Sequence, residues 1–240
     1  MSRPARPSPL HLLAGGGGPR RTQGDPLLAR ALASGPVPNP SVAYVGAASH
    51  DDRSFFSMNE YSMQACGARQ VVFAPMVSEW VKIERTRAIL ESADMVFISG
   101  GDVEAGMRVL EERGVLPLLR EMYLDGKPFF GLSAGSIMLA RQWVRWADPD
   151  DDGTASVFPC MGLAQLVCDT HSEADHWAEL KVLLTRTPDG TVGYGIPSGA
   201  GLCVGPDGTV EALGLPAHRY ARRAGKVVRT ADLPASSLRG

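Results

Sequence analysis

The segment with the clearest chemical potential is Gly131-Leu132-Ser133-Ala134-Gly135-Ser136. An apolar, strand-like run at 128–132 precedes Ser133, and a helix-compatible run at 137–141 follows it. This order is typical of the G-x-S-x-G nucleophile elbow, in which a sharp strand-to-helix turn exposes the serine oxygen. Flanking glycines permit the turn because they lack a Cβ atom. We therefore predict that Ser133 is a nucleophile and that the Ala134 amide faces the developing oxyanion.

A serine nucleophile needs a general base, and the chain contains five histidines. His171 follows an apolar, strand-like run, which would place it in a loop at the carboxyl end of a strand. His50 also follows a predicted strand and is the second choice, whereas His176 is expected on the surface of a helical stretch. We predict His171 as the base.

A carboxylate that orients the histidine would complete a triad. The loop between the serine and the histidine contains four candidates, Asp148, Asp150, Asp151 and Asp152. The chain order serine, aspartate, histidine is one known way to assemble a triad. Most of these aspartates must form a solvated acidic loop, so the residues alone leave the choice open.

A pair of glycines, in Ser99-Gly100-Gly101-Asp102, directly follows another apolar run. Paired glycines at the carboxyl end of a strand let backbone amides approach a ligand, so Gly101 is a candidate second oxyanion donor. The run Gly15-Gly16-Gly17-Gly18 could cradle an anion, but it lacks the spacing and the Lys-Ser/Thr pair of a phosphate loop. We therefore expect no nucleotide and no other cofactor.

Short apolar runs alternate with helical patterns, which is typical of a parallel sheet covered on both faces. The predicted strands are 10–14, 41–46, 70–74, 95–98 and 128–132, and the predicted helices are 25–34, 53–66, 83–92, 103–113 and 115–125. The C-terminal third predicts short strands at 192–196, 201–204, 209–213 and 226–229. We expect one α/β domain over residues 1–240, with a mostly parallel central sheet, helices on both faces and an antiparallel C-terminal fringe. About residues 1–8 and 235–240 are expected to be disordered.

The composition excludes several classes of protein. The chain of 240 residues is 44% hydrophobic and 21% charged, with a formal net charge of −2, so nucleic acid and membranes are not expected partners. No apolar stretch approaches the ~20 residues of a membrane helix, and four cysteines are too few for a secreted disulfide framework. We expect a cytoplasmic protein. The grouping of Cys160, Cys168, His171 and His176 lacks the spacing of a zinc site, so we expect no metal.

Taken together, these motifs resemble peptidase family S51, the dipeptidase E and cyanophycinase group. The resemblance extends over roughly residues 10–215. Its blocks, in chain order, are Gly15-Gly16-Gly17, residues 97–102, residues 131–136, Gly162-Leu163, Asp169-Thr170-His171, and residues 193–196 with Ala200. The family is similar in fold to class I glutamine amidotransferases, which implies a flavodoxin-like sheet.

The resemblance implies a serine peptidase that cleaves small peptides at aspartyl bonds, either Asp-X or β-aspartyl, through an acyl-enzyme. It implies Ser133 as nucleophile and His171 as base, with Asp148 as the triad acid and Asp150 as its alternative. Gly101 and Ala134 would donate to the oxyanion. The residues expected to bind the peptide substrate are Gly100, Asp102, Asp169, Thr170 and Glu173. A homodimer is compatible with this reading.

The stretch after His171 departs from the cyanophycinases, which carry an aromatic residue and several arginines there to hold substrate carboxylates. Residues 172–180 are acidic instead. Carboxylate recognition favours guanidinium groups, so Arg53, Arg141 or Arg145 would have to supply the charge. One alternative is therefore a catalytically weak or inactive member that binds a small ligand in the same cleft. Another is that the acidic stretch selects cationic substrates.

Overall fold

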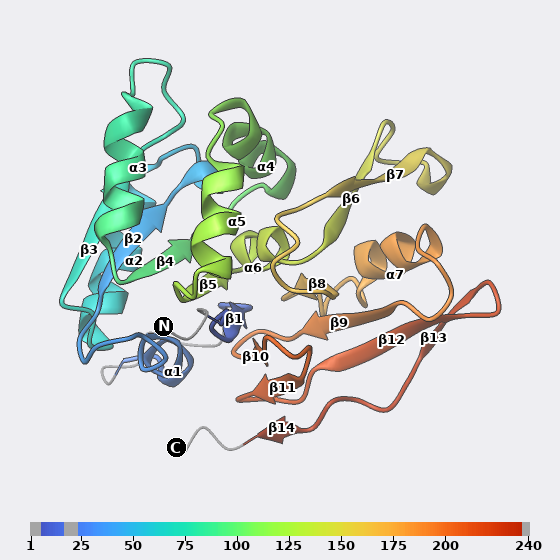
Figure 1. The fold of residues 1–240 in the computed structure, drawn as a ribbon. Coiled ribbons are helices and arrows are strands. Elements are labelled where there is room, and N and C mark those ends of the chain that lie inside the picture. Colours follow the sequence, from blue (N-terminus) through green and yellow to red (C-terminus); the bar gives the residue numbers. More distant parts are fainter. Residues whose placement is uncertain (1–5, 17–23, 237–240) are drawn as a thin grey trace.

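The computed structural model describes residues 6–16 and 24–236. Its main element is an eight-stranded sheet in the order β14-β11-β10-β1-β5-β4-β2-β3 (Figure 1). Its strands are β1 (Leu10–Leu13), β2 (Ser41–Val45), β3 (Gln70–Ala74), β4 (Met95–Ile98), β5 (Phe129–Leu132), β10 (Gly201–Val204), β11 (Val210–Leu213) and β14 (Ala235–Ser236). Neighbours from β1 to β3 run parallel, and β10 pairs antiparallel with β1 and β11. The predicted α/β fold, with its parallel sheet and antiparallel fringe, is confirmed.

Helices cover both faces of this sheet (Figure 1). They are α1 (Pro26–Leu32), α2 (Arg53–Ala65), α3 (Ile83–Ser92), α4 (Val103–Glu112), α5 (Leu116–Leu124), α6 (Ala134–Leu139) and α7 (Ala178–Thr185), with short 3₁₀ turns η1 (Ala47–Ser49) and η2 (Asp152–Thr154). Residues of α1 and α2 pack with Tyr44 and Phe97 on one face, and those of α3 to α6 pack with Val45 and Ile98 on the other. Strands buried on both faces therefore appear as continuous apolar runs. Among the described residues, no helix has the length and apolar character needed to cross a membrane.

A second, four-stranded sheet has the order β13-β12-β9-β8. Its strands are β8 (Val167–Thr170), β9 (Val192–Ile196), β12 (His218–Arg223) and β13 (Lys226–Arg229). A separate hairpin is formed by β6 (Gln142–Trp146) and β7 (Ala155–Pro159). Figure 1 shows α7 lying over this second sheet, on the side of the β6–β7 hairpin.

A row of aromatic side chains crosses the face of the main sheet under α1 and α2. Phe73, Tyr44, Phe97 and Phe130 are successive register partners on β3, β2, β4 and β5. Their ring centroids are separated by 5.9, 5.5 and 5.0 Å, distances at which aromatic rings attract one another. His11 of β1 is the next register partner after Phe130. An imidazole thus continues an otherwise apolar row.

The structure corrects three expectations. Residues 235–236 form β14, which pairs parallel with β11 instead of being disordered, while residues 1–5 and 237–240 lie outside the described part. His176 belongs to the turn before α7, with φ of 51°, and not to a helix. The strands of the β6–β7 hairpin and β12 were not predicted.

Burial of His11 makes stability depend on pH. The side chain is 2% exposed and its Nδ1 has no hydrogen-bond partner; burial, assisted by the charge of Arg30, lowers its pKa from 6.5 to about 4. The unfolded chain therefore binds a proton between these values while the folded chain does not, so stability falls as pH decreases from 6.5 to 4. Urea unfolding at pH 7 and pH 4.5 should show that His11→Leu removes a pH-dependent loss of about 2.5 kcal/mol. The exposed-site variant His176→Gln should retain this loss; an unchanged profile in His11→Leu would contradict the assignment.

Asp169 of β8 has the opposite effect. It is 3% exposed, its Oδ2 is buried without a partner, and burial raises its pKa from 3.8 to about 7 despite the hydrogen bond from the Thr170 amide. The folded chain keeps a proton that the unfolded chain loses, so stability falls as pH rises from 3.8 to 7. Asp169→Asn should therefore gain up to about 4 kcal/mol relative to wild type between pH 4 and pH 8. Asp150→Asn, at an exposed position, is the control and should show no such gain.

Candidate active site

The elbow forms where β5 ends and α6 begins. Ser133 adopts φ 54° and ψ −124°, a strained backbone conformation of the kind that clusters at active sites. Its amide donates to the Leu13 carbonyl of β1 at 2.8 Å. A Cβ atom at Gly135 would overlap the Ile98 carbonyl of β4, so only glycine lets α6 approach the sheet this closely. The carboxyl ends of β1, β4 and β5 together fix the elbow.

The structure brings Ser133 and His171 together from positions 38 residues apart. Ser133 Oγ lies 2.6 Å from His171 Nε2. His171 directly follows β8, and its amide donates to the Ile196 carbonyl of β9 at 2.9 Å. The imidazole is exposed and the serine is partly exposed, so solvent and small molecules can reach the pair. In this arrangement the imidazole can accept the hydroxyl proton during nucleophilic attack.

The acidic loop lies apart from this pair. Asp148 follows β6, and its carboxylate accepts a hydrogen bond from the Asp150 amide at 3.1 Å. Arg186, which follows the carboxyl end of α7, binds the loop by donating to the Asp152 carbonyl at 2.8 Å. Within the described residues, no hydrogen bond joins any of the four loop aspartates to His171. Local turn bonds therefore hold Asp148 in the hairpin, and the structure does not bring the predicted triad acid to the imidazole.

Glu173 is an acid that lies near His171. It is partly buried, and its Oε1 accepts a hydrogen bond from the Ser198 amide in the loop after β9. Burial alone would raise the pKa of Glu173, but the Ser198 hydrogen bond and the charge of His171 outweigh it and lower that pKa. A carboxylate with a lowered pKa thus lies near the imidazole. In the sequence, Glu173 lies two residues after the histidine, at a position predicted to bind substrate.

Two candidate oxyanion donors flank Ser133. Ala134 is the first residue of α6, so its amide has no acceptor within the helix. Gly100 packs against Ser133, because a Cβ atom there would lie 3.2 Å from the serine Cβ and 3.7 Å from its Oγ. The next amide, that of Gly101, donates no hydrogen bond to another described residue. Both predicted donors therefore have an N–H group available for a substrate oxygen.

The side chains of three other residues predicted to bind substrate have structural contacts or are buried. Asp102 caps α4, and its carboxylate accepts from the Ala105 amide at 2.8 Å. Asp169 and Thr170 are each 3% exposed in β8. The sheet buries both side chains, so neither presents its side chain at the surface beside His171. His50, the second choice for the base, is exposed after η1 and has no hydrogen bond to the serine in the described structure.

Two of the arginines considered for carboxylate binding are engaged elsewhere. Arg145 pairs with Glu104 of α4 at 3.2 Å, and the guanidinium of Arg53 lies 4.0 Å from the centroid of the Phe73 ring. Arg141 is exposed between α6 and β6. The structure therefore leaves Arg141 as the least engaged of the three.

The glycine run after β1 borders the loop held by Glu173. The Gly199 amide donates to the Gly15 carbonyl at 2.9 Å, and a Cβ atom at Gly16 would meet the Ser198 hydroxyl at 3.3 Å. Gly17 and Gly18 lie outside the described residues. Gly15 and Gly16 thus make backbone and side-chain contacts with the β9–β10 loop.

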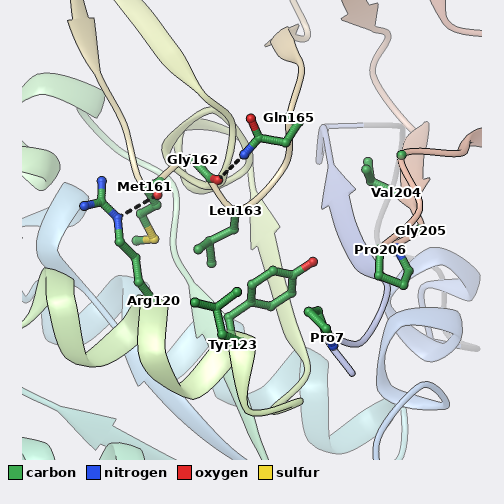
Figure 2. A pocket seen from close by; sticks show the side chains of 12 residues that line it. Pro7, Arg120, Tyr123, Met161, Gly162, Leu163, Gln165, Val204, Gly205 and Pro206 are labelled. Carbon is green, nitrogen blue, oxygen red and sulfur yellow. Dashed lines mark hydrogen bonds between the residues drawn. The ribbon is translucent and has the colours of Figure 1, made fainter. Parts of the chain in front are cut away.

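A pocket of about 450 Å³ opens at the opposite edge of the main sheet (Figure 2). Figure 2 shows Tyr123 of α5 beneath the 161–165 loop, with Pro7 beside it. Pro7 precedes β1, whereas Leu13 at the other end of β1 holds the Ser133 amide. At about 3.3 Å per residue, the length of the strand separates the two places. Neither Ser133 nor His171 lines this pocket.

Comparisons with known proteins agree with this architecture. A solved peptidase from an acI-B1 Actinobacterium is similar over 98% of this chain and 97% of its own, with a TM-score of 0.71 and 16% identity. A putative peptidase E protein from Listeria monocytogenes EGD-e is similar over 86% of this chain and 98% of its own, with a TM-score of 0.64 and 15% identity. At these identities the likeness concerns the fold.

Sequence relatives match over shorter segments. The chain is 37% identical to peptidase E of Pasteurella multocida (strain Pm70) over 60 residues, which is 25% of this chain and 26% of the relative. It is 34% identical to the pyridoxal 5'-phosphate synthase subunit PdxT of Geobacillus sp. (strain WCH70) over 88 residues, 37% of this chain and 40% of that protein. The chain thus spans well under half the length of these curated relatives.

The family model of peptidase family S51 matches residues 11–210. This range contains the elbow, the glycine pair and the histidine after β8, and it covers most of the 240 residues. The chain therefore belongs to peptidase family S51.

Proposed function

We propose that the chain is a serine-type peptidase in which Ser133 and His171 carry the reaction. Ser133 Oγ attacks the amide carbonyl carbon while His171 Nε2 takes the hydroxyl proton, and the same proton then passes to the leaving amine. Water, deprotonated by His171, hydrolyses the acyl-enzyme and regenerates the serine. The observation that carries this proposal is the 2.6 Å contact between Oγ and Nε2 at a strained elbow.

Glu173 is proposed as the acid that orients His171, in place of Asp148. Three features support this choice: its position two residues after the histidine, the hydrogen bond from the Ser198 amide, and the influence of the His171 charge on its pKa. A fixed carboxylate near an imidazole stabilises the imidazolium that forms during attack. Because Ser198 lies in the β9–β10 loop, Glu173 also joins the histidine segment to that loop.

The proposed substrates are small peptides with aspartyl bonds, Asp-X or β-aspartyl, as likeness to the dipeptidase E and cyanophycinase group implies. Arg141 is the proposed partner of the substrate carboxylate, since Arg53 and Arg145 have other contacts. A library that contains acidic, neutral and cationic dipeptides and isopeptides, analysed by mass spectrometry, tests this class directly. Cleavage confined to cationic members would show that the acidic stretch sets the preference instead.

Replacement of the nucleophile is the first test of the reaction. Ser133→Ala should reduce kcat by about 10³-fold or more, because only binding and oxyanion stabilisation remain. An exposed serine of α2 gives a matched control, Ser57→Ala, which should keep wild-type turnover. Thermal unfolding of each variant checks that the fold is intact. Normal turnover by Ser133→Ala would exclude the mechanism, and absence of cleavage by wild type with saturable ligand binding would favour a binding protein.

A second test separates the two candidate acids. Glu173→Gln should lower kcat by about 10- to 100-fold, since the imidazolium loses a stabilising charge, and should move the acid limb of the kcat/KM profile to lower pH. Asp148→Asn should remain within about twofold of wild type, as expected for an exposed surface substitution. The reverse pattern, with Asp148→Asn impaired and Glu173→Gln normal, would restore Asp148 as the acid.

A further inference from the structure

A cluster of hydroxyl groups lies beneath the glycine pair that faces the nucleophile. Ser99 is fully buried, and its Oγ lies 3.2 Å from Ser49 Oγ and 3.3 Å from the Gly100 carbonyl oxygen. Tyr44, also fully buried, directs its phenol toward the same two serines. The three hydroxyls come from β2, η1 and the residue after β4, so they join the connections of two neighbouring strands.

Backbone hydrogen bonds hold both sides of the glycine pair but not the peptide unit within it. The Ser99 amide donates to the Val45 carbonyl at 3.0 Å, and the Asp102 amide donates to the Ala48 carbonyl at 2.8 Å. Between them, the Gly100 carbonyl and the Gly101 N–H belong to one peptide unit. In the described structure, the contact of this unit with a hydrogen-bonding group is the one made by Ser99 Oγ.

The geometry of a peptide unit links that contact to the active site. The carbonyl and the N–H of a trans peptide point in opposite directions, and the plane between them is rigid. A hydroxyl that holds the Gly100 oxygen toward the interior therefore turns the Gly101 N–H the other way. That direction is away from the buried cluster, and Gly100 itself packs against Ser133.

We propose that Ser99 is a positioning residue, which holds the Gly100–Gly101 peptide so that its N–H is aimed at the substrate oxyanion, with Ser49 supporting the Ser99 hydroxyl. The inference rests on the proposed function of Ser133 and extends it to residues that never touch substrate. Without the Ser99 hydroxyl, the two glycines permit rotation of the peptide, and its N–H is no longer preorganised.

The test combines kinetics, inhibitor binding and NMR on the full chain. With the best-cleaved library peptide as substrate, Ser99→Ala should lower kcat about 10-fold or more with little change in KM, since a preorganised oxyanion donor acts mainly in the transition state. Affinity for a peptide boronic acid, which forms a tetrahedral adduct on Ser133, should fall in parallel, while affinity for a non-covalent product peptide is retained.

The control is Ser41→Ala, which removes a buried hydroxyl at the opposite end of β2, where it bonds Asp94 at 2.7 Å. This variant should lose stability but keep wild-type kcat and boronate affinity. In ¹⁵N-glycine spectra, the Gly101 amide should shift in Ser99→Ala and not in Ser41→Ala. This reading does not require turnover, so it separates the two proposals.

Inactivity of wild type with a shifted Gly101 amide in Ser99→Ala would refute the peptidase function and retain the positioning role. An unshifted amide, or equal kcat in Ser99→Ala and wild type, would overturn the positioning role. A loss of kcat in Ser41→Ala as large as that in Ser99→Ala would also overturn it, because general destabilisation would then account for the effect.

Discussion

The close approach of α6 to the carboxyl ends of β1 and β4 is the constraint on which the rest of the site depends. Gly135 meets the Ile98 carbonyl where any side chain would overlap it, and the Ser133 amide is held by Leu13. These contacts leave the serine no relaxed backbone conformation, so its hydroxyl projects from the sheet edge. The glycine pair after β4 then lies against Ser133 because the same strand ends bring it there.

The sequence allowed prediction of the parallel sheet because its strands are buried on both faces and appear as uninterrupted apolar runs. The elbow could be predicted because its glycines and serine are adjacent in the chain. The β6–β7 hairpin could not, since polar residues interrupt the short apolar runs of its two strands. β12, with the sequence HRYARR, has too few apolar residues to indicate a strand, and pairing with β9 and β13 stabilises it instead.

The choice of an acid to orient His171 illustrates a different limit. Chain order favoured Asp148, but order does not specify whether a loop folds toward a histidine or away from it. Short-range turn bonds retain Asp148 in the hairpin, whereas Glu173 is held by an amide 25 residues further along the chain. Contacts of this kind depend on tertiary structure, as do the hydroxyls of Ser49 and Ser99, which are 50 residues apart. Such networks become visible only when the strands are in register.

The proposed nucleophile and the proposed base belong to different sheets: Ser133 extends from the eight-stranded sheet, and His171 from the four-stranded one. The contact between Ser133 and His171 therefore depends on how two separately hydrogen-bonded sheets pack against each other. A shift of 1 Å or so between the sheets would separate Oγ from Nε2 without breaking a single strand pairing, and misplacement of this order is known to be costly in enzymes. Under the proposed mechanism, heat or mild denaturant would therefore abolish activity before the protein unfolds. Activity would then report the alignment of the two sheets more sensitively than spectroscopic measures of secondary structure.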